Sequence, residues 1–225
     1  MNTSPRLQLF KDTLLLIPCS KTKQHRSKPS NAASILSALD PARAAALANA
    51  RAKLSEKIKE EKKPKEAPVD EKTLMPAYLR YSGQLYKHCS ADIGAALAVG
   101  RRVLIVSGGY GLLLADEPIG MYEKRFTLSD WPGGLLEGCI LDYARHEGIQ
   151  SIIAVMARTS TYATLIRRWK RKGAGLPVTL VSPDFRGPNV GQKKVLKAQG
   201  EAITALINNG LDKDWRSSDG LSLEF

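Results

Sequence analysis

The sequence predicts an α/β fold with three layers, in which helices cover both faces of a central, mostly parallel sheet of about four strands. Four short runs of residues are almost wholly apolar instead of alternating with polar residues, as expected for strands covered on both faces. Long segments of mixed character separate these runs, and several of them end at a glycine, a residue typical of helix C-termini. Alternation of strands and helices favours a parallel sheet with right-handed crossover connections.

The predicted strands and helices follow one another along the chain. The strands are expected at residues 13–18, 103–107, 151–156 and 178–182. The helices are expected at residues 85–99, 134–147, 160–172 and 193–209, followed by Gly100, Gly148, Gly173 and Gly210 respectively. The 225 residues are enough for one domain with a core of its own, so we expect a single domain over 1–225.

Residues 39–72 break this pattern and predict a charged helical insertion within the domain. Asp40 is suited to cap the start of a helix and Pro41 to occupy its first position, whereas Pro64 disfavours helical geometry before it. From Arg51 to Lys72, eight basic residues nearly balance six acidic ones. Two interpretations stay open: a solvated surface helix followed by a flexible linker, or a helical arm that contacts nucleic acid or a partner.

The charge of the chain points to a polyanionic partner. The sequence has 34 Lys and Arg against 22 Asp and Glu, a formal net charge of +12. This excess is typical of nucleic-acid-binding proteins, although a basic protein with no polyanion partner remains the alternative. The excess gathers near residues 21–28, 167–172 and 186–197, which follow predicted strands or the helices after them.

The sequence gives little support for a membrane protein, a metalloprotein or a cofactor-dependent enzyme. No apolar run approaches the roughly 18–20 residues that span a bilayer, and the N-terminus lacks a signal-peptide core, so we expect a cytoplasmic protein with no membrane partner. The three cysteines include no C-x-x-C pair, which argues against a zinc cluster or a disulfide framework. The glycine spacings of the phosphate-binding P-loop and of the dinucleotide fingerprint are absent. We therefore expect no metal and no cofactor.

Four polar loops follow the predicted strands, where ligands of parallel α/β sheets bind. The glycine-rich loop that contains Tyr110 allows close backbone approach to a ligand, or it is simply a tight turn. Cys19 is either a thiolate nucleophile or a small buried residue, and Lys21 or Lys23 is either an amine nucleophile or a surface charge. The basic end of the helix at 160–172 indicates phosphate contacts, or it stabilises the helix dipole.

Three sequence motifs stand out: Pro-Cys-Ser-Lys-Thr-Lys at 18–23, Tyr-Ser-Gly-Gln-Leu-Tyr at 81–86, and Val-Leu-Ile-Val-Ser-Gly-Gly-Tyr-Gly-Leu-Leu at 103–113, with Asp116 and Tyr122 after them. Together they resemble the YaaA (peroxide-stress) superfamily. The first loop is also similar to a motif of archaeosine synthases, which act on a modified base in tRNA. The Arg-Leu-Glu-Met-Gly run of YaaA proteins is replaced by Glu-Lys-Arg-Phe at 123–126. The chain is most similar to a phage- and defence-associated branch with a core like that of uracil-DNA glycosylases.

This resemblance implies a DNA glycosylase, a hydrolase of N-glycosyl bonds that flips a modified base, such as glucosylated hydroxymethylcytosine, out of phage DNA. Breaking the bond builds positive charge on the sugar, which a carboxylate can stabilise. The expected carboxylates are Asp116, Glu117 and Asp184. The expected base and sugar pocket consists of Cys19, Ser20, Ser107, Gly108, Gly109, Tyr110, Gly111, Tyr122, Ser160, Tyr162 and Asn189. The expected contacts to DNA phosphates are Lys21, Lys23, Arg158, Arg167, Arg168, Lys170, Arg171, Arg186 and Lys193.

Two other functions remain open at this point. One is a non-catalytic, YaaA-like DNA-binding protein of the stress response. The other is a transferase that modifies a base in tRNA or DNA, with Lys21 or Lys23 as the nucleophile. A nucleotide-dependent enzyme of the Rossmann type is disfavoured, since its fingerprint is missing.

Overall fold

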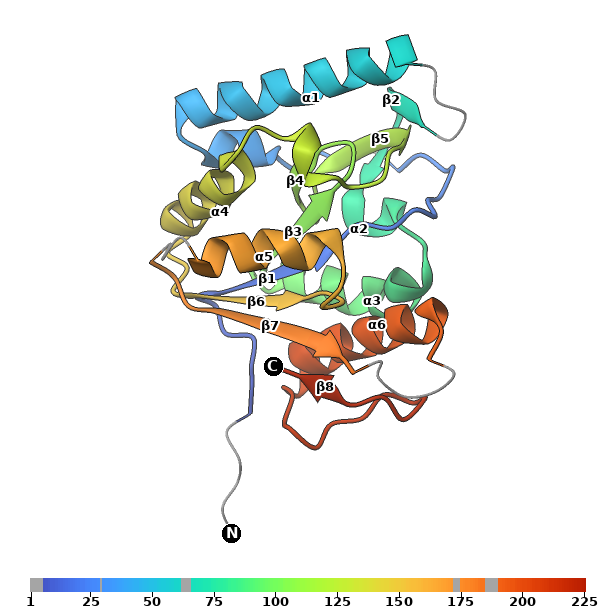
Figure 1. Ribbon diagram of the computed structural model, residues 1–225, viewed down its shortest axis with the longest axis vertical. Coiled ribbons are helices and arrows are strands. Elements are labelled where there is room, and N and C mark those ends of the chain that lie inside the picture. Colours follow the sequence, from blue (N-terminus) through green and yellow to red (C-terminus); the bar gives the residue numbers. More distant parts are fainter. Residues whose placement is uncertain (1–5, 29, 62–65, 172–174, 185–189) are drawn as a thin grey trace.

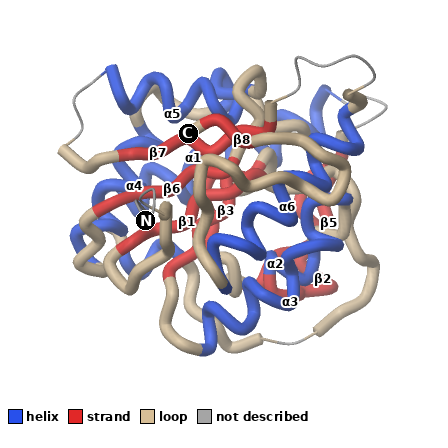
Figure 2. The backbone as a smooth tube through the Cα atoms, turned by 90° about the horizontal axis from the view of Figure 1, so that it is seen from below, coloured by secondary structure: helices blue, strands red, loops and turns tan. Residues whose placement is uncertain are grey.

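The computed structural model describes residues 6–28, 30–61, 66–171, 175–184 and 190–225, and it has an α/β fold (Figure 1). The central sheet of the described chain is mixed and has six strands in the order β4-β3-β1-β6-β7-β8. Its parallel strands are β1 (Thr13–Pro18), β3 (Arg102–Ser107), β6 (Ser151–Val155) and β7 (Val178–Pro183). Figure 2 shows these four strands side by side. They are the four strands predicted from the apolar runs.

Antiparallel strands extend the sheet at both edges. β4 (Gly111–Leu114) pairs with β3, and β8 (Leu223–Glu224) pairs with β7. A separate two-stranded sheet contains β2 (Ala67–Pro76) and β5 (Pro118–Glu123). The prediction of a central sheet of about four strands was therefore too small, because β4 directly continues a glycine-rich loop and β8 has only two residues.

Helices cover both faces of the central sheet (Figure 1). One face carries α1 (Pro41–Glu61), α4 (Leu135–His146) and α5 (Thr161–Arg171), together with the 3₁₀ turns η1 (Ile35–Ala38) and η2 (Leu128–Asp130). The other carries α2 (Ala77–Arg80), α3 (Gln84–Ala98) and α6 (Gln192–Asn208). The side chains of β1, which is buried throughout, alternate between the two layers, since Leu14 and Leu16 face the first group while Leu15 and Ile17 face the second.

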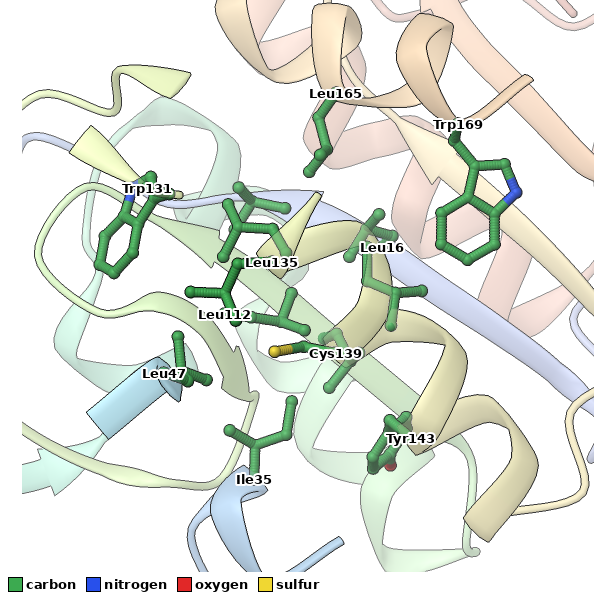
Figure 3. Packing of buried hydrophobic residues seen from close by; sticks show 14 of the residues in the cluster. Leu16, Ile35, Leu47, Leu112, Trp131, Leu135, Cys139, Tyr143, Leu165 and Trp169 are labelled. Carbon is green, nitrogen blue, oxygen red and sulfur yellow. The ribbon is translucent and has the colours of Figure 1, made fainter. Parts of the chain in front are cut away.

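Helix α1, in the predicted insertion, packs on the core of the domain. Its buried residues Leu47, Ala50, Leu54 and Ile58 recur every three or four positions and therefore share one face of the helix. Figure 3 shows Leu47 among the buried side chains of β4 and η1. Within the described residues the helix ends at Glu61, and residues 67–76 form β2 instead of a helix or linker.

The order of the strands locates a switch point in the sheet. Strand β1 lies between β3 and β6, so the chain passes from β1 to β3 on one side and then returns across β1 to β6 on the other. In open α/β sheets, ligands bind outside the carboxyl ends of strands at such a point. The loops that follow β1 and β6 are therefore the first place to look for a site.

No helix of the described chain is long and apolar enough to cross a membrane.

Candidate site at the carboxyl edge of the sheet

Two side chains join the loops on either side of the switch point. Cys19 directly follows β1, and Tyr162 lies in the first turn of α5, which follows β6. The Sγ atom of Cys19 and the hydroxyl oxygen of Tyr162 are 3.2 Å apart, within hydrogen-bond distance. The Tyr162 ring stacks on Phe126, with ring centroids 4.8 Å apart. This stack forms an aromatic wall beside a half-buried thiol.

A buried triangle of hydroxyl groups lies behind that wall. The Tyr81 and Tyr122 hydroxyl oxygens are 2.8 Å apart, and the Tyr122 hydroxyl is 2.9 Å from Ser107 Oγ. The Tyr81 hydroxyl also donates to Ser107 Oγ at 3.3 Å. Burial raises the pKa of both tyrosines well above its ordinary value, because a phenolate would lose its hydration. The hydroxyls therefore act as neutral hydrogen-bonding groups.

Lys23 carries an ammonium group into this tyrosine cluster. Its side chain is 2% exposed, and its Nζ lies 4.2 Å from the centroid of the Tyr122 ring. The Nζ donates to the carbonyl oxygen of Lys21 at 3.1 Å and lies 3.6 Å from Oε1 of Glu123. Burial lowers the pKa of Lys23, while the nearby Glu123 carboxylate opposes the shift. An amine that loses its proton more readily than usual is thus placed beside a carboxylate.

The glycines of the 107–111 loop make room for the protein's own chain. A Cβ atom at Gly109 would lie 2.7 Å from the Tyr122 ring, and one at Gly108 would lie 2.1 Å from the carbonyl oxygen of Lys124. Gly111 adopts a φ of +73°, which favours glycine. The Tyr110 hydroxyl accepts a hydrogen bond from the Gly120 amide at 2.9 Å. The loop is therefore packed against the segment at 120–125.

Arg51 of α1 fastens this loop from the other side. Its guanidinium donates to the carbonyl oxygens of Tyr110 and Leu112 at 2.9 and 2.7 Å, and it lies over the Tyr110 ring. It also pairs with Glu117 at 3.3 Å. The helix of the insertion thus helps to hold the loop that the sequence assigned to the pocket.

The Glu117 carboxylate, one of the expected catalytic groups, is fully engaged in structural contacts. It is 3% exposed. Its oxygens accept hydrogen bonds from Ser34 Oγ at 2.8 Å, the Ile35 amide at 2.9 Å and the Leu114 amide at 3.1 Å, besides the pair with Arg51. Glu117 therefore ties η1 and α1 to the end of β4.

Asp116 lies away from the 107–111 loop. Strand β4 runs antiparallel to β3, with Ser107 opposite Gly111 and Leu104 opposite Leu114. The Ala115 amide donates to the carbonyl oxygen of Val103, near the start of β3. The structure thus places Asp116 towards the amino ends of the parallel strands, whereas the expected pocket residues Ser107 and Tyr110 lie at the carboxyl ends.

Acidic groups at the carboxyl edge include Glu123 of β5, Asp184 after β7, and Glu224 of β8, which pairs with Arg158. Glu123, the last residue of β5, has a side chain 41% exposed beside Lys23. Asp184 directly follows β7 and is half-buried, and its amide donates to the carbonyl oxygen of Ser222 at 2.8 Å.

The exposed residues among the expected phosphate contacts fall into two groups. Exposed cations at the carboxyl edge are Lys21 after β1, Arg158 after β6 and Lys193 in the first turn of α6; Arg125 after β5 joins them. Arg167, Arg168 and Lys170 are exposed along α5. Lys23 is buried in the tyrosine cluster. The Arg171 side chain, Arg186 and Asn189 lie outside the described residues.

Two expected pocket serines have local structural surroundings. Ser160 Oγ accepts a hydrogen bond from the Ala163 amide at 3.2 Å and so caps the start of α5. Ser20 packs against Gly83, where an added Cβ would lie 2.2 Å from the serine Oγ. Both residues shape the loops at the switch point.

The sequence reasoning missed several contributors: Tyr81, Arg51, Glu123 and Phe126. Tyr81 belongs to a motif of the family, but its role depends on meeting Ser107 and Tyr122, which no local spacing indicates. In the sequence, Arg51 is one charge among many in the insertion. Along 120–123 the structure alternates buried and half-buried positions, so Tyr122 and Glu123 point in opposite directions, but the residues Gly-Met-Tyr-Glu show no clear alternation in the sequence.

Comparison with known proteins decides the family. A family profile described as "Peroxide stress protein YaaA" matches residues 13–129, which include β1, the tyrosine cluster and the glycine-rich loop. The chain belongs to the YaaA family. The resemblance seen in the three motifs is thereby confirmed. Neither the curated proteins nor the solved structures gave a match.

The matched region of this YaaA protein contains most of the site but not all of it. Tyr162, Arg158 and α6 lie beyond residue 129, so the aromatic wall and part of the basic edge come from the unmatched half of the chain. Within the described residues, no group of three or more His, Cys, Asp or Glu is arranged to hold a metal ion. The chemistry at hand is that of an amine, a thiol, a carboxylate and neutral phenols.

Proposed function

We propose that this YaaA protein binds DNA through the carboxyl edge of its sheet. The supporting observation is that four loops each bring an exposed cation to that edge: Lys21, Arg125, Arg158 and Lys193. Arg158 is already paired with Glu224 at 2.8 Å, which leaves the other three as the stronger phosphate contacts. Such a rim attracts the phosphates of DNA whatever its base sequence, while the stack of Phe126 and Tyr162 offers a surface for a base.

The test is the salt dependence of binding to a fluorescein-labelled duplex, measured by anisotropy from about 50 to 200 mM KCl. We expect the triple variant Lys21→Gln, Arg125→Gln, Lys193→Gln to bind more weakly. The slope of the logarithm of its binding constant against the logarithm of the salt concentration should be shallower by about 0.9 for each phosphate that the variant no longer neutralises. The control triple Lys11→Gln, Arg101→Gln, Arg145→Gln removes the same charge from residues that lie next to the amino ends of the strands. Equal weakening by both triples would mean that net charge alone attracts DNA.

Excision of a modified base from phage DNA, in host defence, is a second candidate function. It is favoured by the position of Glu123, a partly exposed carboxylate 3.6 Å from a buried amine at the edge of the tyrosine cluster. In this scheme Glu123 takes a proton from water, the water oxygen bonds to C1′ of the sugar, and the C1′–N bond breaks with its electrons leaving on the base. Asp184 and Glu224 also lie near this edge, but Glu224 is paired with Arg158.

Release of free base separates the two functions. Genomic DNA with ordinary or glucosylated cytosines is incubated with the protein, and mass spectrometry detects the freed base. The hydrolytic proposal expects release that Glu123→Gln abolishes and Asp116→Asn preserves. Absence of release, with DNA binding intact, would leave the non-catalytic function. Release that survives both Glu123→Gln and Asp184→Asn would remove the carboxylates from the mechanism.

A further inference from the structure

Strand β7 has an unpaired stretch on its outer side. On its inner side β7 pairs with β6 from Val178 to Val181. On its outer side β8 pairs only with Ser182 and Pro183. Among the described residues, no strand covers β7 from Val178 to Val181 on that side.

The hydrogen-bond pattern shows which backbone groups face outward there. The carbonyl oxygens of Pro177 and Val181 accept from Ile152 and Met156, so odd-numbered positions of β7 bond to β6. The N–H and C=O groups of Val178 and Leu180 therefore point away from β6, since successive residues of a strand alternate. An open edge of this kind is a template for a further strand.

A groove runs along this stretch, between β7 and α5. It encloses about 400 Å³, and its lining includes Ile166, Arg167 and Lys170 of α5, Val178 and Leu180 of β7, Phe225, and Arg158, which is paired with Glu224. The Val178, Thr179 and Leu180 positions are only half-buried, unlike the rest of the strand. Phe225 is 46% exposed. The floor of the groove is thus apolar, and it is open to solvent.

The wall of the groove is positively charged. The Arg167 guanidinium is held in place by hydrogen bonds to the carbonyl oxygen of Arg158 at 2.7 Å and to Thr164 Oγ1 at 2.9 Å. Lys170 is exposed and forms no ion pair with a carboxylate of the described chain. Glu224 lies nearby but already pairs with Arg158. The groove therefore favours an anionic occupant.

We infer that an acidic, extended peptide segment of a partner protein docks in this groove as an added strand beside β7. Such a segment supplies both N–H and C=O groups for Val178 and Leu180, and its carboxylates match Arg167 and Lys170. A nucleic-acid strand fits less well, because phosphates accept hydrogen bonds but cannot donate to the open carbonyls. A second copy of the chain would bring like charges together at α5. The inference does not depend on the proposed function.

The test uses a fluorescein-labelled peptide that alternates glutamate and valine over six residues, so that one register places every glutamate on the side that faces α5. We expect it to bind the full-length protein, with the dissociation constant raised about tenfold or more by Arg167→Glu or Lys170→Glu. Arg168→Glu is the matched control, since Arg168 is exposed on the same helix but does not line the groove. A lysine–valine peptide and a backbone N-methylated glutamate–valine peptide should not bind.

Amide exchange followed by NMR gives a second readout that does not require variants. The Val178 and Leu180 amides should exchange quickly in the free protein and become protected when the acidic peptide is added. Unchanged exchange at these amides, or equal weakening by Arg168→Glu and Lys170→Glu, would overturn the inference. A concentration-dependent dimer that protects these amides without peptide would identify a second copy as the occupant. Loss of DNA binding in Lys170→Glu, with the acidic peptide not bound by the wild type, would assign the groove to nucleic acid.

Discussion

Two adjacent carboxylates, Asp116 and Glu117, have quite different surroundings. Glu117 is buried, faces Arg51, and accepts hydrogen bonds from groups of η1 and β4. Asp116 is half-buried and lies at the opposite end of β3 from Ser107. Removing the counter-ion of a buried charge destabilises the folded protein far more than removing the counter-ion of a partly exposed charge.

Substitution of Glu117 should therefore destabilise the folded protein more than substitution of its neighbour Asp116. We expect Glu117→Gln to lower the free energy of unfolding by about 3 kcal/mol, because Arg51 would keep its charge without the facing carboxylate. Asp116→Asn should change it by less than about 0.5 kcal/mol. Urea denaturation followed by circular dichroism measures both. Equal effects would contradict the structural role assigned to Glu117.

The buried tyrosines should make stability sensitive to alkaline pH. In the folded protein the pKa values of Tyr81 and Tyr122 are raised by burial, whereas in the unfolded chain these groups titrate near their usual value of about 10. The stability they contribute is complete below that pH. Above it the unfolded chain releases protons that the folded chain retains, so stability falls as pH rises.

The Tyr122→Phe variant tests this directly. Between about pH 10 and 11 it should lose less stability than the wild type, by up to about 1.4 kcal/mol per pH unit for the single proton removed. Urea denaturation over that range gives the two slopes. Tyr78→Phe, at a half-buried tyrosine on α2, is the comparison variant. Parallel pH profiles for wild type and Tyr122→Phe would show that Tyr122 ionises normally in the folded state.

Among the elements, the 107–111 loop needs glycine at several positions, because a side chain there would collide with neighbouring residues. We expect Gly109→Ala to lower the free energy of unfolding by about 1–3 kcal/mol, because the added methyl group would lie 2.7 Å from the Tyr122 ring. Gly133→Ala is the control, since no atom lies within 4 Å of its added Cβ. Thermal unfolding of the two variants gives the difference. A Gly109→Ala protein as stable as the control would mean that Tyr122 shifts without penalty.

Strand-like apolar runs and glycine-terminated helices allowed most elements of the α/β layers to be predicted. Strand β4 was missed because its four residues, Gly111–Leu114, look like the continuation of a glycine-rich loop. That omission had a large effect on the predicted site. In the sequence Asp116 follows the loop closely. In the structure, however, β4 runs antiparallel to β3 and brings the chain back to the amino end of β3 before Asp116.

The contacts of the candidate site depend on distant pairings and so were only partly predictable. Cys19 and Tyr162 could be selected because they lie in segments that follow predicted strands, and Tyr122 because it follows the family motif at 103–113. The partners of Tyr122 and Lys23 could not, because Tyr81 follows α2 and Glu123 ends β5, and these segments meet the loop after β1 only in the folded chain. Local sequence patterns carry little information about such long-range contacts.

At the scale of the whole molecule, α1 belongs to the same core as the sheet. Leu47 is fully buried with Leu112 and Trp131 in the cluster shown in Figure 3. We expect Leu47→Ala to lower the free energy of unfolding by about 2–5 kcal/mol, in a single transition seen by both tryptophan fluorescence and circular dichroism. Leu74→Ala, at a residue that is 38% exposed, should have a much smaller effect. Two separate transitions would instead indicate that α1 unfolds as an arm.

The position of β1 sets the order in which the sheet can form. This strand is made early in synthesis, yet it lies between β3 and β6, and the Thr13 and Ser151 hydroxyls that meet across one pairing are 138 residues apart in the chain. Loop closure over such distances slows folding. In addition, β1 stays without its second neighbour until β6 has been synthesised and has left the ribosome. Until then β1, whose residues are all buried in the folded protein, has an exposed backbone edge at which a nascent chain is prone to aggregate.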